Sequence, residues 1–543
     1  MTATADGGLP RRGLLALGLA AALPLVSACS SGSKDDEGGK GGKGSSAGTL
    51  RVLASSELAD MKPVLDAART ATGVTVDATW SGTLDAVDRV ASGAAAGAFD
   101  AIWLSSNDYL RLRPEAAKKI TSETPVMTSP VAFGIKMPAL KRLGWDPERV
   151  TWSEIERAVA DGRLTYGMTD PVRSNSGFSA LVSIASGLSG AQSALREADV
   201  RKATPKLKEF FTGQKLTSGS SGWLADAFIR RGSVDGLINY ESVLLTLNRD
   251  HLMDLAVIRP RDGVVTADYP LTVLASASQD ARDSAHALAT HLRGTEAQRQ
   301  LTERTFRRPV VASVRPAARL STAKRRELPF PGSLAVADGL LASYENDLRR
   351  PSRTVYVLDT SGSMNGDRLA QLKRALGQLA GSDVSPTGDR FRDREEVTLM
   401  PFGSRVKGVR THTVPGERPA PVLAAIRADA EALTADGDTA IFSSLQAAYD
   451  HLAQRRSALG DDRFTSIVLM TDGENTTGAT ASDFDAYYRR LRGPERTAPV
   501  FPIVFGDSDR SQLQSIATLT GGRLFDATKG SLDGAFEEIR GYQ

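Results

Sequence analysis

The sequence predicts an α/β protein of at least two domains behind a separate N-terminal leader. Its 543 residues exceed what one compact domain usually holds, and 41% of them are hydrophobic, which suffices for ordinary buried cores. Short apolar runs alternate with helical patterns along residues 49–345 and again along residues 350–543. Residues 1–48 differ from both regions in composition, so we expect them to lie outside the folded domains.

Composition excludes several classes of function. The 67 Lys and Arg residues nearly balance the 64 Asp and Glu residues, which argues against a broad nucleic-acid-binding surface. Cys29 is the single cysteine, so internal disulfides, Cys-based zinc sites and iron-sulfur clusters are excluded. His286 and His291 lie five positions apart and do not share a helix face as a metalloprotease pair would. The sequence lacks the metalloprotease motif H-E-x-x-H and the nucleotide-binding P-loop. A hydrolase is therefore the weakest of the functional hypotheses, and we expect no enzyme.

The N-terminus has the order of a secretory signal. Arg11 and Arg12 precede an apolar run over residues 13–28 that ends in small residues. The run is shorter than the roughly 18 residues that span a bilayer, and Pro24 disfavours a helix there. We therefore expect cleavage rather than a membrane span.

The run ends in Val-Ser-Ala-Cys, which resembles the lipobox of bacterial lipoproteins. The resemblance implies removal of residues 1–28, lipidation of Cys29 and a lipid-anchored place on the extracytoplasmic face of the cell membrane. The alternative is a buried structural cysteine behind a plain signal. The arginine pair is also similar to a twin-arginine export signal, so the export route stays open between that pathway and the general secretory one. After Cys29, a tract rich in Ser, Gly and Lys makes residues 29–48 a lipidated flexible tether, with a span of about 25 Å.

In the middle region, small polar residues follow the predicted strands. The strand over residues 49–53 is followed by Ser55 and Ser56, and the strand over residues 99–104 by Ser105. Ligands collect at the carboxyl ends of strands in open α/β sheets, so these endings predict a binding cleft. The alternative is that each serine only caps a helix.

Several short stretches within residues 49–345 together carry a family resemblance. They are Leu50-Arg51-Val52-Leu53-Ala54-Ser55-Ser56-Glu57, Asp100-Ala101-Ile102-Trp103-Leu104-Ser105, Ser129-Pro130-Val131-Ala132-Phe133-Gly134-Ile135, Asp170-Pro171, Ser174-Asn175-Ser176-Gly177 and Tyr269-Pro270-Leu271. Through these stretches, residues 49–345 resemble the type II extracellular solute-binding proteins. The resemblance implies a two-lobed periplasmic-binding-protein-like domain that closes over a small polar solute. Strands near residues 130–136 and 269–276 would be the crossovers between the lobes.

The candidate solute ligands follow from these stretches and from isolated aromatic residues. They are Ser55, Ser56, Trp80, Ser105, Asp170, Ser174, Asn175, Ser176, Tyr240 and Tyr269. The solute class stays open. An oxyanion would use the serines and Arg173, whereas a sugar would use aromatic platforms with Glu57 or Glu241.

The C-terminal region alternates strands and helices more regularly. The predicted strands cover residues 354–358, 397–402, 406–413, 467–470, 500–505 and 523–526, and the predicted helices cover residues 369–379, 422–433, 441–452, 484–491, 513–519 and a closing segment from residue 532. Strands this apolar are buried on both faces, which predicts a doubly wound, mostly parallel sheet.

Three polar loops lie at the ends of strands or at the start of a helix in this region. Asp359-Thr360-Ser361-Gly362-Ser363 comes directly after the first strand, Gly437-Asp438-Thr439-Ala440 opens a helix, and Thr471-Asp472-Gly473 follows another strand. A switch-point cleft would bring the two carboxylates together, and a hard divalent cation prefers such oxygen ligands. The sequence therefore predicts a Mg²⁺ or Mn²⁺ site.

These loops are similar to the metal-ion-dependent adhesion site of von Willebrand factor A domains, a Rossmann-like fold. Asp359, Ser361 and Ser363 satisfy D-x-S-x-S, Thr439 matches the family's threonine and Asp472 its later aspartate. The resemblance covers residues 350–543 and implies that a Glu or Asp of a protein partner completes the metal coordination. The alternative is an Asx turn without metal.

Together these features predict a membrane-anchored lipoprotein for recognition, adhesion or sensing outside the cell. The alternative is a solute receptor for an ABC-type importer, with the C-terminal domain as a docking module.

Overall fold

A computed structural model describes residues 48–381, 390–459, 463–506, 508–528 and 532–542. The predicted signal, Cys29 and residues 29–47 of the predicted tether lie outside the described residues. Among the helices of the described ranges, none is both long and apolar enough to cross a bilayer.

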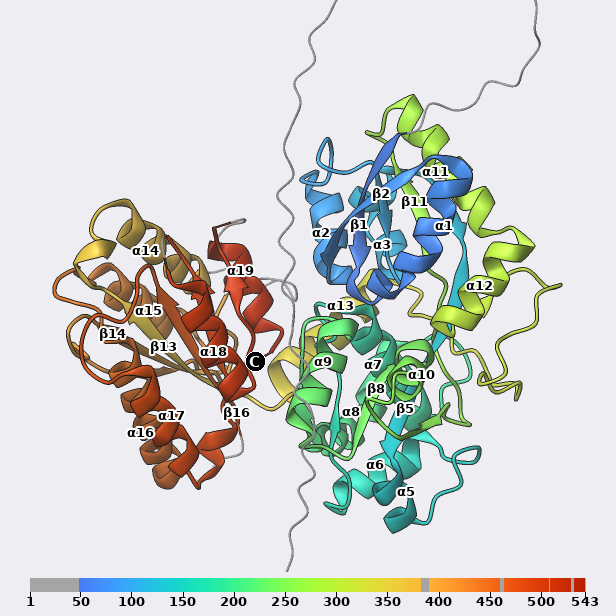
Figure 1. Cartoon of the computed structure of the whole chain (residues 1–543). Helices are drawn as coiled ribbons and strands as arrows, with labels where there is room; N and C mark the ends of the chain where they lie inside the picture. The colour runs from blue at the N-terminus through green and yellow to red at the C-terminus, as the bar shows by residue number, and fades with distance from the viewer. Residues whose placement is uncertain (1–47, 382–389, 460–462, 507, 529–531, 543) are drawn as a thin grey trace, which may run out of the picture. The chain divides into compact units, whose positions relative to one another are not determined.

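The first sheet, which we call the lobe 1 sheet, has the strand order β2-β1-β3-β11-β4. Its strands β1, β2 and β11 are labelled in Figure 1. β1, β2 and β3 run parallel, and β11 is antiparallel to both of its neighbours. Its strands are β1 (Thr49–Ser55), β2 (Thr75–Ser81), β3 (Ala101–Trp103), β4 (Ile120–Pro125) and β11 (Pro270–Leu274). The helices that accompany these strands in the chain are η1 (Ser56–Met61), α1 (Lys62–Thr72), α2 (Thr83–Ser92), α3 (Asp108–Leu112), α4 (Pro114–Ala117), α11 (Gln279–Leu292) and α12 (Thr295–Thr305).

The second sheet, which we call the lobe 2 sheet, has the order β10-β5-β8-β6-β7, with β9 and β12 also paired to β5. Its strands are β5 (Met127–Lys136), β6 (Tyr166–Gly167), β7 (Gln214–Leu216), β8 (Gly236–Tyr240), β9 (Leu255–Ile258), β10 (Thr266–Ala267) and β12 (Arg308–Pro309). The helices of this part of the chain are α5 (Met137–Leu143), α6 (Trp152–Ala160), α7 (Asn175–Ser189), α8 (Glu197–Phe211), α9 (Ser221–Arg231) and α10 (Glu241–Arg249), with α13 (Leu334–Ser343) and η2 (Tyr344–Leu348) later in the chain.

The two predicted crossover strands each belong to a single sheet. β5 pairs only within the lobe 2 sheet, and β11 pairs only with β3 and β4. The chain passes between the sheets in the short segments before β5 and before β11, so the expectation of crossover strands is corrected to short connections. Tyr269 lies in the second connection and has a left-handed φ of 44°, which lets the chain turn there.

The third sheet confirms the predicted doubly wound topology, with the order β15-β14-β13-β16-β17-β18. Its strands are parallel except β15, which is antiparallel to β14. They are β13 (Ser352–Asp359), β14 (Glu396–Phe402), β15 (Arg410–Thr413), β16 (Phe464–Thr471), β17 (Val500–Val504) and β18 (Phe525–Asp526). The helices are η3 (Gly362–Met364), α14 (Asp367–Leu379), α15 (Ala420–Glu431), α16 (Ile441–Leu459), α17 (Ala481–Arg490), η4 (Pro494–Thr497), α18 (Arg510–Thr520) and α19 (Leu532–Arg540).

The central strand β13 is buried on both faces, as its apolar sequence predicts. Tyr356 and Leu358 belong to a core that includes side chains of α14, α15 and α19. Val355 and Val357 belong to a second core with α16, α17 and α18. Alternate residues of one strand thus serve two helical layers, which is the arrangement of a doubly wound sheet. The predicted strand over residues 406–413 is shorter than expected, because regular pairing with β14 begins only at Arg410.

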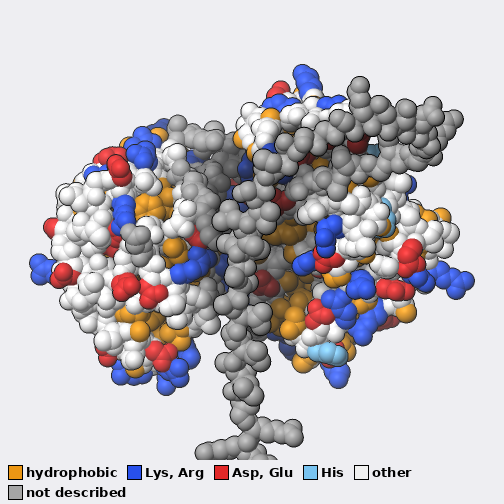
Figure 2. All heavy atoms as spheres, turned by 45° about the horizontal axis from the view of Figure 1, so that its top comes forward, with side chains coloured by type: hydrophobic (Ala, Val, Ile, Leu, Met, Phe, Trp, Pro, Cys, Tyr) orange, Lys and Arg blue, Asp and Glu red, His pale blue; other side chains and the backbone are white. Residues whose placement is uncertain are grey.

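Charged side chains of both signs are interspersed over the visible face of the molecule (Figure 2). This distribution agrees with the near balance of 67 basic and 64 acidic residues.

Gly522 tests the close packing of the third sheet. A Cβ at this position would lie 1.8 Å from the carbonyl oxygen of Val500, so backbone must move to admit it. We expect Gly522→Ala to lower the apparent melting temperature, at a cost of about 2 kcal/mol or more. Gly377, inside α14 with open space around it, is the matched control, and Gly377→Ala should stabilise by about 0.5–1 kcal/mol. Equal effects of the two substitutions in thermal unfolding would contradict this packing.

Candidate functional site

The first candidate site lies at the switch point of the third sheet. β13 and β16 are adjacent and parallel, and the chain continues from them to opposite edges of the sheet. Asp359 is the last residue of β13, and Asp472 directly follows β16. Ligands bind at such switch points because the loops after the two strands separate there.

Backbone hydrogen bonds hold the three predicted loops together. The Gly362 N–H donates to the Gly437 carbonyl at 2.8 Å, and the Asp436 N–H donates to the Thr360 carbonyl at 2.9 Å. The Thr476 N–H donates to the Thr439 carbonyl at 2.8 Å, which ties the helix-opening loop to the loop after β16. The loops are therefore in contact, as the metal-site hypothesis requires.

The predicted metal ligands also meet through their side chains. Ser363 Oγ lies 3.1 Å from Ser361 Oγ and donates to Asp472 Oδ1 at 2.8 Å. A Cβ built on Gly473 would lie 4.0 Å from both Ser363 Oγ and Thr439 Oγ1, so the threonine hydroxyl belongs to the same group.

Asp359 is held by two hydrogen bonds at the base of the site. Its Oδ1 accepts from the Ser361 N–H at 2.8 Å, and its Oδ2 accepts from Thr471 Oγ1 at 2.6 Å. Burial raises the pKa of Asp359 above its ordinary value, and the negative charge of Asp472 adds to this rise.

The donor set fits a hard divalent cation. Asp359 and Asp472 are 0% and 1% exposed, and three hydroxyl groups adjoin them. Two buried carboxylates with hydroxyl oxygens suit Mg²⁺, which takes few protein ligands and keeps several waters. Within the described ranges no group of three or more His, Cys, Asp or Glu side chains could hold a metal.

Three residues of this site were missed at the level of sequence. Thr471 holds Asp359, Thr476 Oγ1 accepts from the Thr439 N–H at 2.9 Å, and Arg368 Nη1 donates to Asp472 Oδ2 at 2.6 Å. Thr471 belongs to the predicted loop Thr471-Asp472-Gly473. Its hydroxyl at the end of an apolar strand could have identified it as part of the site. Arg368 carried no signal, because only the folded chain brings it to Asp472.

The second candidate site is a set of buried hydroxyl groups between the two lobes. On lobe 1, Thr83 Oγ1 lies 3.1 Å from Ser55 Oγ and 3.2 Å from Ser105 Oγ. On lobe 2, Ser176 Oγ lies 2.8 Å from Thr169 Oγ1 and accepts from Ser221 Oγ at 2.7 Å. Thr83, Thr169 and Ser221 were not predicted.

The lobes touch at this place. Ser56 Oγ of lobe 1 donates to Ser220 Oγ of lobe 2 at 2.8 Å. The Leu84 N–H donates to the Arg173 carbonyl at 3.1 Å. The predicted ligands Ser56 and Ser174 therefore lie where both lobes contribute polar groups.

These serines begin helices without capping them. Ser55 precedes η1, Ser174 precedes α7 and Ser220 precedes α9, and none of the three makes a side-chain hydrogen bond to its helix. By contrast, Thr151 and Ser278 do cap their helices. The capping alternative therefore does not describe Ser55, Ser174 or Ser220.

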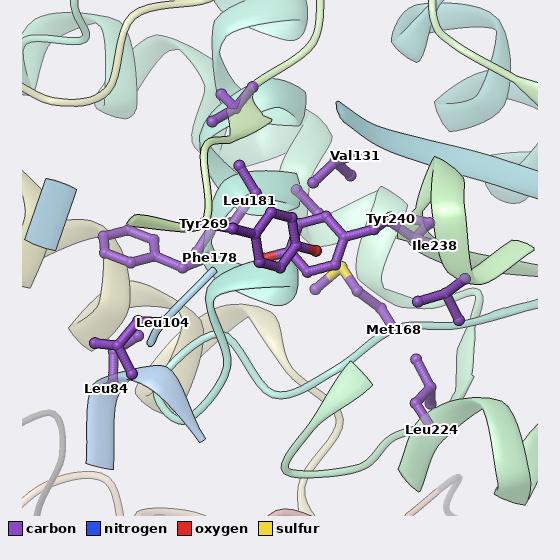
Figure 3. Close-up of a cluster of buried hydrophobic side chains, with 14 of the residues drawn as sticks. Leu84, Leu104, Val131, Met168, Phe178, Leu181, Leu224, Ile238, Tyr240 and Tyr269 are labelled. Atoms are coloured by element: carbon purple, nitrogen blue, oxygen red, sulfur yellow. The ribbon is translucent and has the colours of Figure 1, made fainter. Parts of the chain in front are cut away.

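Two of the predicted aromatic ligands, Tyr240 and Tyr269, lie among buried hydrophobic side chains (Figure 3). Tyr240 and Tyr269 pack edge to face with ring centroids 5.8 Å apart, and Asn175 Nδ2 donates to the Tyr240 hydroxyl at 3.2 Å. Arg307 Nη1 donates to both carboxylate oxygens of Asp60 at 2.7 and 2.8 Å.

The remaining candidates differ in their surroundings. Trp80 lies in the edge strand β2 and is 40% exposed, whereas the other nine predicted solute ligands are buried. Asp170 Oδ1 accepts from the Val172 N–H, so it stabilises its own turn.

Two charged side chains that could distinguish an oxyanion from a sugar, Glu241 and Arg173, are already ion-paired. Glu241 is bound by Arg308 through two contacts of 2.9 Å, so it does not offer its carboxylate to a sugar. Arg173 Nη1 lies 3.2 Å from Asp85.

Two family models match the chain. Residues 50–307 match the bacterial extracellular solute-binding proteins, and residues 355–538 match the von Willebrand factor type A domain.

Curated relatives align with part of the chain. The human inter-alpha-trypsin inhibitor heavy chain H4 is 29% identical over 154 residues, which is 27% of this chain and 16% of that protein. An uncharacterised protein of Synechocystis is 33% identical over 135 residues, which is 25% of this chain and 28% of that protein. The alignments thus span less than a third of these relatives.

Solved periplasmic binding proteins align with about half of the chain. The binding protein AfuA of Actinobacillus pleuropneumoniae is 14% identical and covers 56% of this chain and 99% of its own, with a TM-score of 0.44. The sulfate-binding protein SubI of Mycobacterium tuberculosis is 19% identical and covers 55% of this chain and 99% of its own, with a TM-score of 0.42.

The buried carboxyl of Glu57 gives a test by pH dependence. Burial raises the pKa of its carboxyl to about 7, and Arg307 opposes this rise only in part. In the unfolded chain this pKa is about 4.3, so the native state binds more protons between these values and loses stability as the pH rises. Relative to Glu57→Gln, the parent should lose roughly 2–4 kcal/mol from pH 4.5 to pH 8. Thermal unfolding of both chains across this range measures it, and a constant difference would contradict the buried, neutral carboxyl.

Proposed function

Because the chain combines a bacterial extracellular solute-binding domain with a von Willebrand factor type A domain, we propose that it is an extracytoplasmic recognition protein. In this proposal a protein partner binds through a Mg²⁺ or Mn²⁺ ion at the switch point, and a small polar solute binds between the two lobes. The chain acts by binding and not by catalysis.

The proposal rests on the close placement of Asp359 and Asp472 beside three hydroxyl groups. Ser361, Ser363 and Thr439 would hold the cation, and the two aspartates would supply the negative charge around it. When bound, the cation supplies an electrophilic position that accepts a carboxylate from outside. Since few of the donors are anionic, the cation would keep its attraction for a Glu or Asp side chain of the partner.

The uncapped start of α7 supports a solute site between the lobes. Its N–H groups have no side-chain cap, and the hydroxyls of Ser174 and Ser176 adjoin them. At the start of α9, the Gly222 N–H donates to the Ser56 hydroxyl at 3.4 Å. N–H groups at a helix start and hydroxyl donors both stabilise negative charge. We therefore assign the solute to small oxyanions rather than to sugars.

Cys29 supports attachment to the membrane. It is the single cysteine of the chain and follows the sequence Val-Ser-Ala. Lipidation there would place both domains on the extracytoplasmic face, at the end of a short tether.

The metal-dependent partner can be tested with the full chain. We expect an envelope extract to yield a protein that the chain captures in Mg²⁺ and releases in EDTA. Asp359→Asn and Asp472→Asn should abolish this capture, because each removes one of the two buried negative charges. Thr439→Ala should only weaken it, because water can replace one hydroxyl ligand.

The chain offers matched controls for these variants. Asp438 lies in the same loop as Thr439, Asp367 is the first residue of α14, and both are exposed. Asp367→Asn and Asp438→Asn should leave capture unchanged. Capture that persists in EDTA, or in a folded Asp359→Asn chain, would refute the metal-dependent mechanism.

The solute site is tested by thermal stabilisation of the full chain. Sulfate or phosphate should raise the apparent melting temperature by mass action, whereas glucose and maltose should not. Joint replacement of Ser174, Asn175 and Ser176 by Ala should remove the shift, since these residues provide the helix-start donors. A shift with a sugar alone would assign the cleft to the other solute class.

A further inference from the structure

Arg368 places a positive charge of the protein inside the candidate metal site. Its Nη1 lies 2.6 Å from Asp472 Oδ2, and the other oxygen of that carboxylate accepts from Ser363. The Asp472 side chain is 0% exposed and that of Arg368 is 33% exposed. The pair thus occupies a carboxylate that the proposed function assigns to the cation.

The position of Arg368 is not explained by the stability of its helix. Arg368 is the second residue of α14. The start of a helix carries partial positive charge, so a cation there is unfavourable unless another group compensates it. Asp472 provides that compensation from another element of the sheet.

The end of β17 is shaped around the guanidinium group. Gly506 follows β17 with a left-handed φ of 63°. A Cβ at this position would lie 2.9 Å from Arg368 Cζ and 3.2 Å from both Nε and Nη1. A residue without a side chain therefore leaves the room that the Arg368 head group takes beside Asp472.

We propose that Arg368 competes with the divalent cation for Asp472. Without metal, the guanidinium neutralises the buried carboxylate and keeps the three loops assembled. When metal binds, Arg368 has to release Asp472 or share it, so metal affinity is lower than the donor set alone would give. This inference rests on the proposed metal site and adds a residue that sets its affinity.

The charge count gives the direction of the effect. With both carboxylates ionised, Asp359, Asp472 and Arg368 sum to one negative charge, and without Arg368 they sum to two. A cation is therefore attracted more strongly once the arginine charge is removed, even though water and salt screen the effect. Removal of the arginine charge also leaves the buried carboxylate of Asp472 without an ion-pair partner in the metal-free chain, which lowers the stability of that state.

Titration of the full chain with Mn²⁺, followed by the electron paramagnetic resonance of free Mn²⁺, tests the proposal. Arg368→Gln should lower the Kd for Mn²⁺ about ten-fold. Arg368→Lys should give an intermediate Kd, because it keeps the charge but loses the planar fork. Arg374→Gln removes an exposed arginine from the same helix and should leave the Kd within about two-fold of the parent.

Thermal unfolding provides a second readout that needs no partner. In EDTA, Arg368→Gln should melt below the parent, and saturating Mn²⁺ should remove the difference. An unchanged or raised Kd for Arg368→Gln, with Mn²⁺ bound by the parent, would overturn the competition and leave the proposed metal site intact. Failure of both the parent and Arg368→Gln to bind Mn²⁺ would overturn the metal site and this inference together.

Discussion

The loops of the C-terminal domain are organised around two buried carboxylates at the ends of adjacent strands. Asp359 and Asp472 extend from β13 and β16 at the switch point of the sheet. Burial of an ion costs several kcal/mol unless hydrogen bonds or an opposite charge compensate it. Ser361, Ser363 and Thr471 donate to these carboxylates, so the loops after both strands depend on them. Arg368 pairs with Asp472 and offsets one of the two negative charges.

The same requirement applies to the buried hydroxyl groups where the two lobes meet. Buried hydroxyls need partners, and here they find them in one another across the two lobes, as between Ser56 and Ser220. A solute that accepts hydrogen bonds would replace these mutual contacts without leaving the donors unpaired. Burial raises the pKa of Glu57 to about 7, so the charge of this side chain varies near neutral pH.

The sequence predicted the parts of the structure that depend on local pattern. The order of strands and helices follows from apolar periodicity, and Asp359 and Asp472 could be placed because each directly follows an apolar strand. The role of Arg368 could not be predicted, since it depends on how the start of α14 meets the end of β17. Thr83, Ser220 and Ser221 were missed because single hydroxyls in helix starts carry no specific pattern. Trp80 was assigned to the cleft by residue type alone, and its place in an edge strand exposes it.

The metal site can be located most directly by a crystal structure of the full chain grown with Mn²⁺, with anomalous scattering recorded for the metal. We expect an anomalous peak bonded to the hydroxyl oxygens of Ser361 and Ser363, with Thr439 and the two aspartates around it. We also expect the contact of Arg368 with Asp472 to be lengthened or broken. A map in which Mn²⁺ is absent from the switch point, with the contact between Arg368 and Asp472 intact, would contradict the proposed metal site.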